Sequence, residues 1–161
     1  MAFRMEVTGV ADLIQKMDKI GEKGRDCASL ALYEGARVTA DAVGGAVQGI
    51  ATEPFKYAGS GQKRKPSPEE KAVLTGAKHG VAKFRKGVTK IDTSVGYQNS
   101  GYGEIKGKTV PVPLIANAIN SGTSFMQKQP FIRKAFSQSK GAAQAAIENK
   151  LREELDKLST D

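Results

Sequence analysis

Apolar residues alternate with charged ones at the start of the chain and then follow a helical period. Phe3, Met5 and Val7 occupy every second position, which predicts a short half-buried strand. From 10 to 20, and again from about 23 to 50, apolar residues recur at steps of three and four. This spacing predicts a small amphipathic helix followed by a long one.

The long helix expected over 23–50 carries mostly small apolar residues, and Gly35, Gly44 and Gly45 lie inside it. Each interior glycine costs about 1 kcal/mol relative to alanine. Close packing of this helix against a sheet or a neighbouring helix would explain them. A kink near Gly44 and Gly45 is the alternative. The apolar residues that keep the helical spacing are Cys27, Leu30, Ala31, Val38, Ala42, Ala46 and Ile50.

Residues 52–68 predict a loop, because they combine prolines and glycines with a run of three basic residues. A short helix is expected next, with Ser67 as its N-cap, Pro68 at its first position and its end near Gly76. The segment 78–86 is compatible with a turn, a helical fragment or an edge strand.

The period changes to two near residue 88, which predicts a strand over 88–97. A second strand over 105–112 is expected to pair with it as a hairpin. Pro113 then opens a helical turn before Gly122, where the chain can turn because glycine takes a positive φ at no steric cost.

Pro130 is expected at the first position of the last helix, where its missing N–H costs nothing. Beyond it, apolar residues form one stripe, which predicts a long C-terminal amphipathic helix. The stripe consists of Ile132, Ala135, Phe136, Ala143, Ile147, Leu151, Leu155 and Leu158.

Together these elements predict one α+β domain over 1–161, with a small, mostly antiparallel sheet packed against a long central helix. No run approaches the ~18 apolar residues of a membrane span, so no membrane partner is expected. The single cysteine excludes an internal disulfide, and synthesis in a cytoplasm follows as the default.

The positive charge is concentrated in one segment. Residues 52–90 contain ten lysines and arginines but three acidic residues, which is +7 of the net charge of +8. This segment could contact a polyanion or an acidic partner. A solvated loop whose lysines maintain solubility is the equal alternative. The candidate contact residues are Lys63, Arg64, Lys65, Lys83, Arg85 and Lys86.

No catalytic or metal-binding pattern is visible in the sequence. His79 is the only histidine, and Cys27 lies far from it along the chain. The run 59–65 lacks the spacing of a phosphate-binding loop. We therefore expect no enzyme activity and no cofactor. Aromatic residues among the lysines, Phe55, Tyr57 and Phe84, could stack on bases or fold back onto the body.

The stretch 119–136 resembles the signature of the tail-completion or head–tail joining (neck) proteins of long-tailed bacteriophages. It has a Gly-Thr, a variable loop, a Gln-Pro-Phe and a closing amphipathic helix. The residues that carry the resemblance are Gly122, Thr123, Gln129, Pro130 and Phe131. The order of predicted elements extends it over nearly the whole chain. Asn120 replaces an acidic residue common in the family, and Thr75–Lys78 lacks the leucine of its Thr-Gly-x-Leu.

The resemblance implies a structural virion protein of a tailed phage or prophage, made in the host bacterial cytoplasm and placed at the head–tail junction. Such a protein acts by assembly, as a possible ring of its own copies or on other neck, tail or head proteins. Gly122, Thr123, Pro130 and Phe131 are the candidate interface residues, with a basic, flexible loop at about 52–87. The alternative function is non-specific nucleic-acid binding through 52–90.

Overall fold

The computed structural model describes residues 3–5, 21–57, 59, 61–78, 80–81, 85–86, 91–97 and 100–159. The helix expected over 10–20 lies outside these residues. In chain order the elements are β1 (Phe3–Met5), α2 (Glu22–Ala46), the 3-10 turn η1 (Val47–Gly49), α3 (Pro68–Gly76), β2 (Gly80–Val81), β3 (Arg85–Lys86), β4 (Ile91–Gly96), β5 (Tyr102–Ile105), β6 (Lys108–Pro111), α4 (Val112–Ser121) and α5 (Phe131–Ser159).

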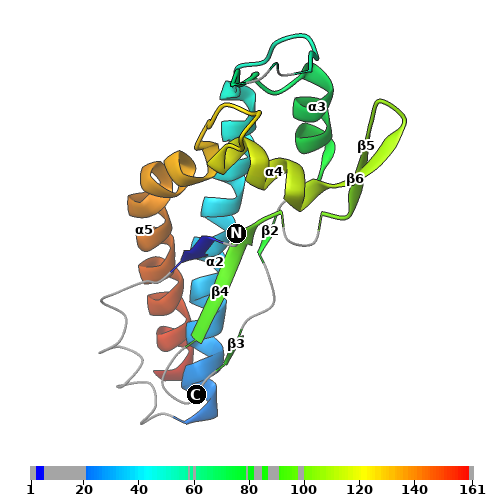
Figure 1. Ribbon diagram of the computed structural model, residues 1–161. Coiled ribbons are helices and arrows are strands. Elements are labelled where there is room, and N and C mark those ends of the chain that lie inside the picture. The colour runs from blue at the N-terminus through cyan, green and yellow to red at the C-terminus, as the bar shows by residue number, and fades with distance from the viewer. Residues whose placement is uncertain are drawn as a thin grey trace.

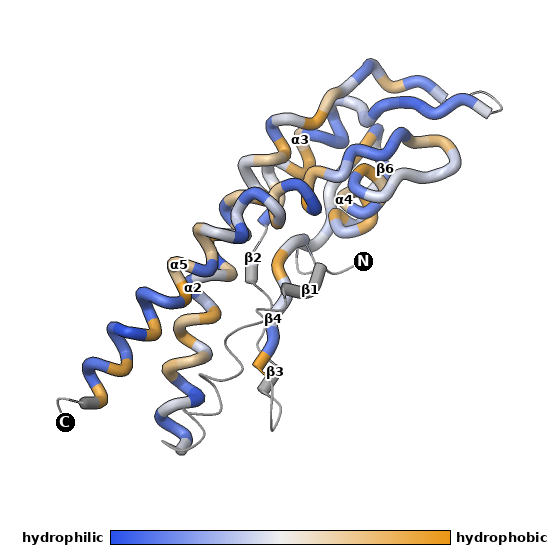
Figure 2. The backbone as a smooth tube through the Cα atoms, turned by 90° about the vertical axis from the view of Figure 1, so that its left-hand side faces the viewer, coloured by the Kyte–Doolittle hydropathy of each residue, from blue (hydrophilic) through white to orange (hydrophobic). Residues whose placement is uncertain are grey.

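Helices α2 and α5 form a long antiparallel pair, and the sheet around β4 packs on the opposite side of α2 (Figures 1 and 2). α2 is therefore the central layer between α5 and the sheet. This arrangement confirms the predicted α+β fold, the small antiparallel sheet, the long central helix and the long C-terminal helix.

The small residues of α2 allow α5 to approach closely. A Cβ placed on Gly35 would lie 2.9 Å from the carbonyl oxygen of Ala143 and would overlap the side chain of Ile147. Ala31 and Ala36 are buried on the same helix. The glycine in mid-helix is thus explained by helix packing. Leu30, which the spacing placed on the inner stripe, is instead 48% exposed.

The apolar core has two parts. The larger one joins α2, α4 and the start of α5 with Val95 and Tyr97 of the sheet region, and the ring of Phe131 lies 6.4 Å from that of Tyr97. The smaller one lies at the other end of the helix pair, around Cys27, Ile147 and Leu151. We call the end that carries α3, α4 and the β5–β6 hairpin the head (Figure 1).

The strand pairing differs from the prediction. β4 pairs antiparallel with β1, β2 and β3, while β5 and β6 pair only with each other among the described strands. The expected hairpin of 88–97 with 105–112 was therefore wrong. Lys106 and Gly107 close the β5–β6 hairpin with φ values of 50° and 71°, which suits a tight two-residue turn.

The segment 52–87 is not one loop. It contains α3, capped by Ser67 with Pro68 in its first turn as predicted, and the two short strands β2 and β3. Of the alternatives for 78–86, the edge strand is the one observed at 80–81 and 85–86. The longest irregular part of the described residues here is 51–57, 59 and 61–67, and we call this segment the strap.

Candidate functional site

The head brings together five segments from two stretches of the chain, 51–76 and 102–130, that are distant in the sequence. They are the strap, α3, the β5–β6 hairpin, α4 and the loop 122–130, which we call the motif loop. A parallel bridge joins the strap to the motif loop at Arg64 and Met126. The N–H of Arg64 donates to the Phe125 carbonyl at 2.9 Å, and the N–H of Gln127 donates to the Arg64 carbonyl at 2.8 Å.

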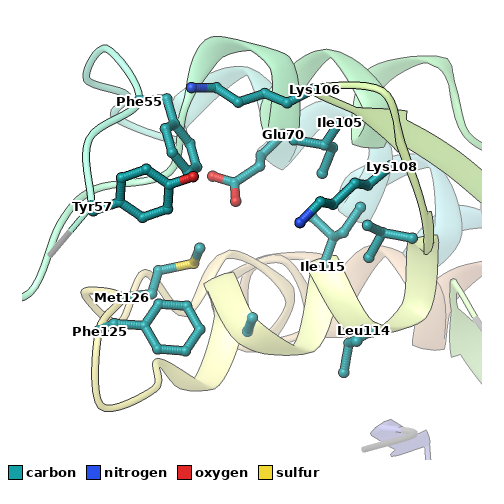
Figure 3. A pocket seen from close by; sticks show the side chains of 12 residues that line it. Phe55, Tyr57, Glu70, Ile105, Lys106, Lys108, Leu114, Ile115, Phe125 and Met126 are labelled. Atoms are coloured by element: carbon teal, nitrogen blue, oxygen red, sulfur yellow. The ribbon is translucent and has the colours of Figure 1, made fainter.

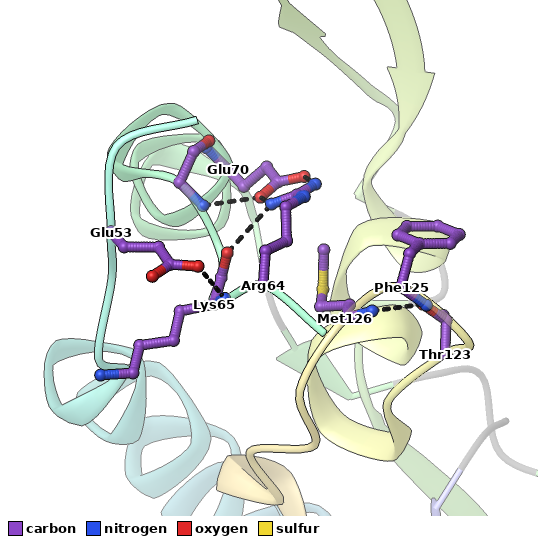
Figure 4. A network of polar contacts seen from close by, with 8 residues as sticks. Glu53, Arg64, Lys65, Glu70, Thr123, Phe125 and Met126 are labelled. Carbon is purple, nitrogen blue, oxygen red and sulfur yellow. Dashed lines mark hydrogen bonds and ion pairs between the residues drawn. The ribbon is translucent and has the colours of Figure 1, made fainter. Parts of the chain in front are cut away.

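The motif loop is held by its own polar groups. Gly122 has a φ of 76°, and a Cβ there would lie 3.1 Å from the Cβ of Lys128. The Thr123 hydroxyl accepts hydrogen bonds from the N–H groups of Phe125 and Met126 at 3.3 and 3.0 Å. These bonds fix a compact turn (Figure 4). The Gly-Thr pair therefore shapes the loop.

Two amides connect the motif loop and α5 to the rest of the head. The Gln129 side chain accepts from the Ala51 N–H at 2.9 Å and donates to the Ala51 carbonyl at 2.8 Å. The Asn120 side chain, buried on α4, accepts from the N–H of Ile132 at 3.1 Å in the first turn of α5. Asn120 thus satisfies a helix N–H that has no intrahelical partner.

A buried ion pair anchors the strap to α3. The guanidinium of Arg64 donates to both carboxylate oxygens of Glu70 at 2.7 and 2.6 Å, and the two side chains are 7% and 8% exposed. Glu70 also accepts from the Ser67 N–H at 2.7 Å, which completes a capping box at the start of α3. The Lys65 N–H donates to Glu53 at 2.6 Å (Figure 4).

The electrostatics of this pair favour the charged state. Burial raises the pKa of the Glu70 carboxyl, but the bonds from Arg64 and Ser67 outweigh burial, so the net shift of its pKa is downward. Glu70 is therefore ionised at neutral pH. Its charge is neutralised by Arg64 and does not contribute a free negative charge to the surface beside it.

Beside this pair the five segments enclose an apolar groove with a volume of about 300 Å³ (Figure 3). Its wall on the strap side carries Phe55 and Tyr57, whose rings meet edge to face at 5.3 Å. Leu114 of α4 and Phe125 of the motif loop line the opposite wall and are 58% and 49% exposed. The groove is thus open to solvent, and apolar side chains in its walls are exposed.

Two lysines of the hairpin lie above the groove. The Lys106 ammonium lies 3.5 Å from the centre of the Phe55 ring. The guanidinium carbon of Arg64 lies 4.9 Å from the centre of the same ring. Lys108 lines the groove and points into it (Figure 3). Neither lysine forms an ion pair with a carboxylate of the described residues. The groove is therefore apolar below and positively charged on one side.

The four candidate interface residues take mainly internal positions. Gly122 and Thr123 are half-buried and shape the motif loop, and Pro130 directly precedes α5, with its carbonyl accepting from Lys134 at 3.0 Å. Phe131 is 5% exposed and belongs to the core. Phe131 is therefore corrected from a surface contact to a core residue, because its ring fills the space beside Tyr97.

Five of the six candidate polyanion contacts lie in the described part of the chain, and they belong to two separate segments, the strap and β3. Arg64 is buried in its ion pair, so its charge is not available to a partner, while Lys63 is exposed and Lys65 half-buried. Arg85 and Lys86 lie on β3, away from the head (Figure 1). Lys83 lies outside the described residues. The basic residues of the strap are separated from those of β3 because α3 and β2 lie between the two segments.

The residues that line the groove were not selected from the sequence as a site. The sequence identifies Phe55 and Tyr57 as aromatic residues among lysines, for which folding back onto the body is one alternative. Phe125 lies between two of the motif residues, and its position in a polar loop was the available signal. No local sequence pattern marks Leu114 or Lys108 as a site residue. They line the same groove only because the hairpin packs against α4.

No group of three or more histidine, cysteine, aspartate or glutamate side chains suited to a metal occurs in the described part of the chain. Within those same residues, no helix combines the length and apolar character needed to cross a membrane. Comparison with protein-family models, with curated proteins and with solved structures found no match to this chain.

Proposed function

We propose that this chain is a structural assembly protein of a tailed-phage virion, completing the tail or joining the head to the tail without catalysis. The observation that carries the interface part of this proposal is the solvent-open apolar groove in the head. Apolar anchors that enter such a pocket dominate the binding energy of protein interfaces. The placement in a virion rests on the resemblance carried by residues 119–136.

The geometry of the head supports this function because the residues that carry the resemblance determine the shape and position of the motif loop. Gly122 and Thr123 shape the loop, Gln129 fastens it to the strap, and the loop then presents Phe125 at the groove. These contacts hold the loop in the position from which Phe125 lines the groove. The proposed contact surface is therefore the groove itself and its aromatic walls.

Inactivation of the reading frame in its source genome tests this function. After induction, the proposal expects filled heads and complete tails that remain separate when lysates are examined by negative-stain electron microscopy. Supplying the chain from a plasmid should restore joined particles. Joined particles without the chain, or loss of heads altogether, would refute the proposal.

A further inference from the structure

We propose that the groove receives an acidic, apolar segment of a different protein, in which large apolar side chains are flanked by aspartate or glutamate. This inference rests on the proposed function, since it names the partner of that same surface. It follows from the lining of the groove, from the charge above it, and from the net charge of the chain, which disfavours a second copy.

The lining defines the apolar part of the partner. Leu114, Ile115 and Phe125 form one side of the groove, and Phe55 and Tyr57 form the other. A volume of about 300 Å³ is at the small end of ligand sites and suits a few apolar side chains. Glu70 lines the groove as well, but Arg64 and Ser67 already bond its carboxylate.

The charge above the groove defines the polar part of the partner. Lys106 and Lys108 place two ammonium groups on one side, without carboxylate partners among the described residues. Opposite charges on a partner would be attracted there and would fix its register in the groove. Carboxylates beside an apolar anchor provide that complement.

Nucleic acid fits this surface less well. A bound strand requires cations spaced along its phosphates. The third cation that would extend the row, Arg64, is buried in its ion pair with Glu70. The Phe55 ring, which could otherwise stack on a base, already contacts the Arg64 guanidinium and the Lys106 ammonium.

A second copy of the chain is also disfavoured. Copies with a net charge of +8 repel one another. The acidic, leucine-containing end of α5 is already engaged, because Glu153 and Glu154 form ion pairs with Lys150 and Lys157. Leu155 and Leu158 there pack against the core cluster at the end of α2.

The experiment measures binding of labelled peptides to the full chain by fluorescence anisotropy. The test peptide has a central Leu-Phe pair between glutamates. One matched peptide replaces the Leu-Phe pair by serines, a second replaces the glutamates by lysines, and a labelled oligothymidylate serves as the nucleic-acid probe. We expect saturable binding of the test peptide, about tenfold tighter than that of either matched peptide.

A double charge reversal, Lys106→Glu with Lys108→Glu, should weaken test-peptide binding by about tenfold or more. The matched control is Lys23→Glu with Lys140→Glu, which changes the net charge equally at two exposed helix positions and should leave binding unchanged. Leu114→Glu provides a second groove variant at a residue that is 58% exposed. Circular dichroism verifies the folding of each.

Four results would overturn the inference: no saturable binding of the test peptide, equal weakening in both charge-reversed variants, tighter binding of oligothymidylate, or self-association of the chain that the groove variants abolish. The last would identify a second copy as the occupant. If the peptide-binding assay gives one of these results, the proposed function is still supported when heads and tails remain separate in the mutant that lacks the chain. Joined particles in that mutant would remove the proposed function independently of peptide binding.

Discussion

Replacing Arg64 with leucine removes one half of the ion pair that anchors the strap. The guanidinium bonds both oxygens of Glu70, and it donates a further hydrogen bond to the Lys65 carbonyl at 3.1 Å. Leucine fills part of the same space and offers no donor. The Glu70 carboxylate would then remain buried with the Ser67 N–H as its main remaining donor.

Removing one partner of a buried ion pair lowers the free energy of unfolding by about 3–5 kcal/mol, because the other charge is left uncompensated. In a chain of this size that corresponds to a fall in Tm of roughly 6–20 °C. We expect the lower half of both ranges for Arg64→Leu, since the bond from Ser67 to Glu70 is retained.

The loss should depend on pH. In the native chain the pKa of Glu70 is lowered, so its contribution to stability is present above the ordinary carboxyl pKa of about 4.3 and is lost as the pH falls through the folded value. In Arg64→Leu, burial without Arg64 should raise that pKa. The variant then no longer buries an uncompensated charge once the carboxyl takes up a proton. The difference in the free energy of unfolding between the two proteins therefore narrows on acidification.

Urea unfolding followed by far-UV circular dichroism, at neutral pH and near pH 4, measures both effects. Arg37→Leu is the control, because Arg37 forms an exposed ion pair with Glu34 at 3.1 Å. Its stability should change little at either pH. A loss below about 1 kcal/mol in Arg64→Leu, as is typical of exposed pairs, or a loss that does not vary with pH, would refute the reasoning.

Two further predictions concern the helix pair and the motif loop. Gly35→Ala should lower the Tm despite the better helix propensity of alanine, because its Cβ would overlap Ile147, whereas Gly141→Ala, with nothing within 4 Å, should raise it. Equal Tm changes in both variants would contradict this packing. Gln129→Glu keeps the acceptor for the Ala51 N–H but places an oxygen against the Ala51 carbonyl, and the loss of this exposed hydrogen bond should cost about 0.5–1.5 kcal/mol in urea unfolding. An unchanged midpoint would exclude this amide pairing.

The parts of the fold set by local chemistry were predictable. The apolar stripe of α5, the Ser67 cap with Pro68 behind it, and the turn at Gly122 each follow from residues close together in sequence. All three are confirmed. The alternating residues before Tyr97 also predicted β4 correctly as a strand.

The pairing of β4 and the groove depended on distant residues. β4 takes β1 from the start of the chain as a neighbour, and no local pattern selects that strand over β6. The Gln129 side chain reaches Ala51 across 78 positions. Arg64 was interpreted as a surface charge because basic residues are usually solvated, and only the folded position of Glu70 accounts for its burial.

The most direct test of the central claim, that the groove is the assembly surface, compares two leucine substitutions in the source strain lacking the gene. Leu114 in the groove is 58% exposed and Leu30 on α2 is 48% exposed, so Leu114→Glu and Leu30→Glu should both fold. The fraction of heads joined to tails is counted by electron microscopy. We expect that Leu30→Glu restores joined particles as the native chain does and that Leu114→Glu fails. Equal restoration by both variants, or failure of Leu30→Glu alone, would contradict the claim.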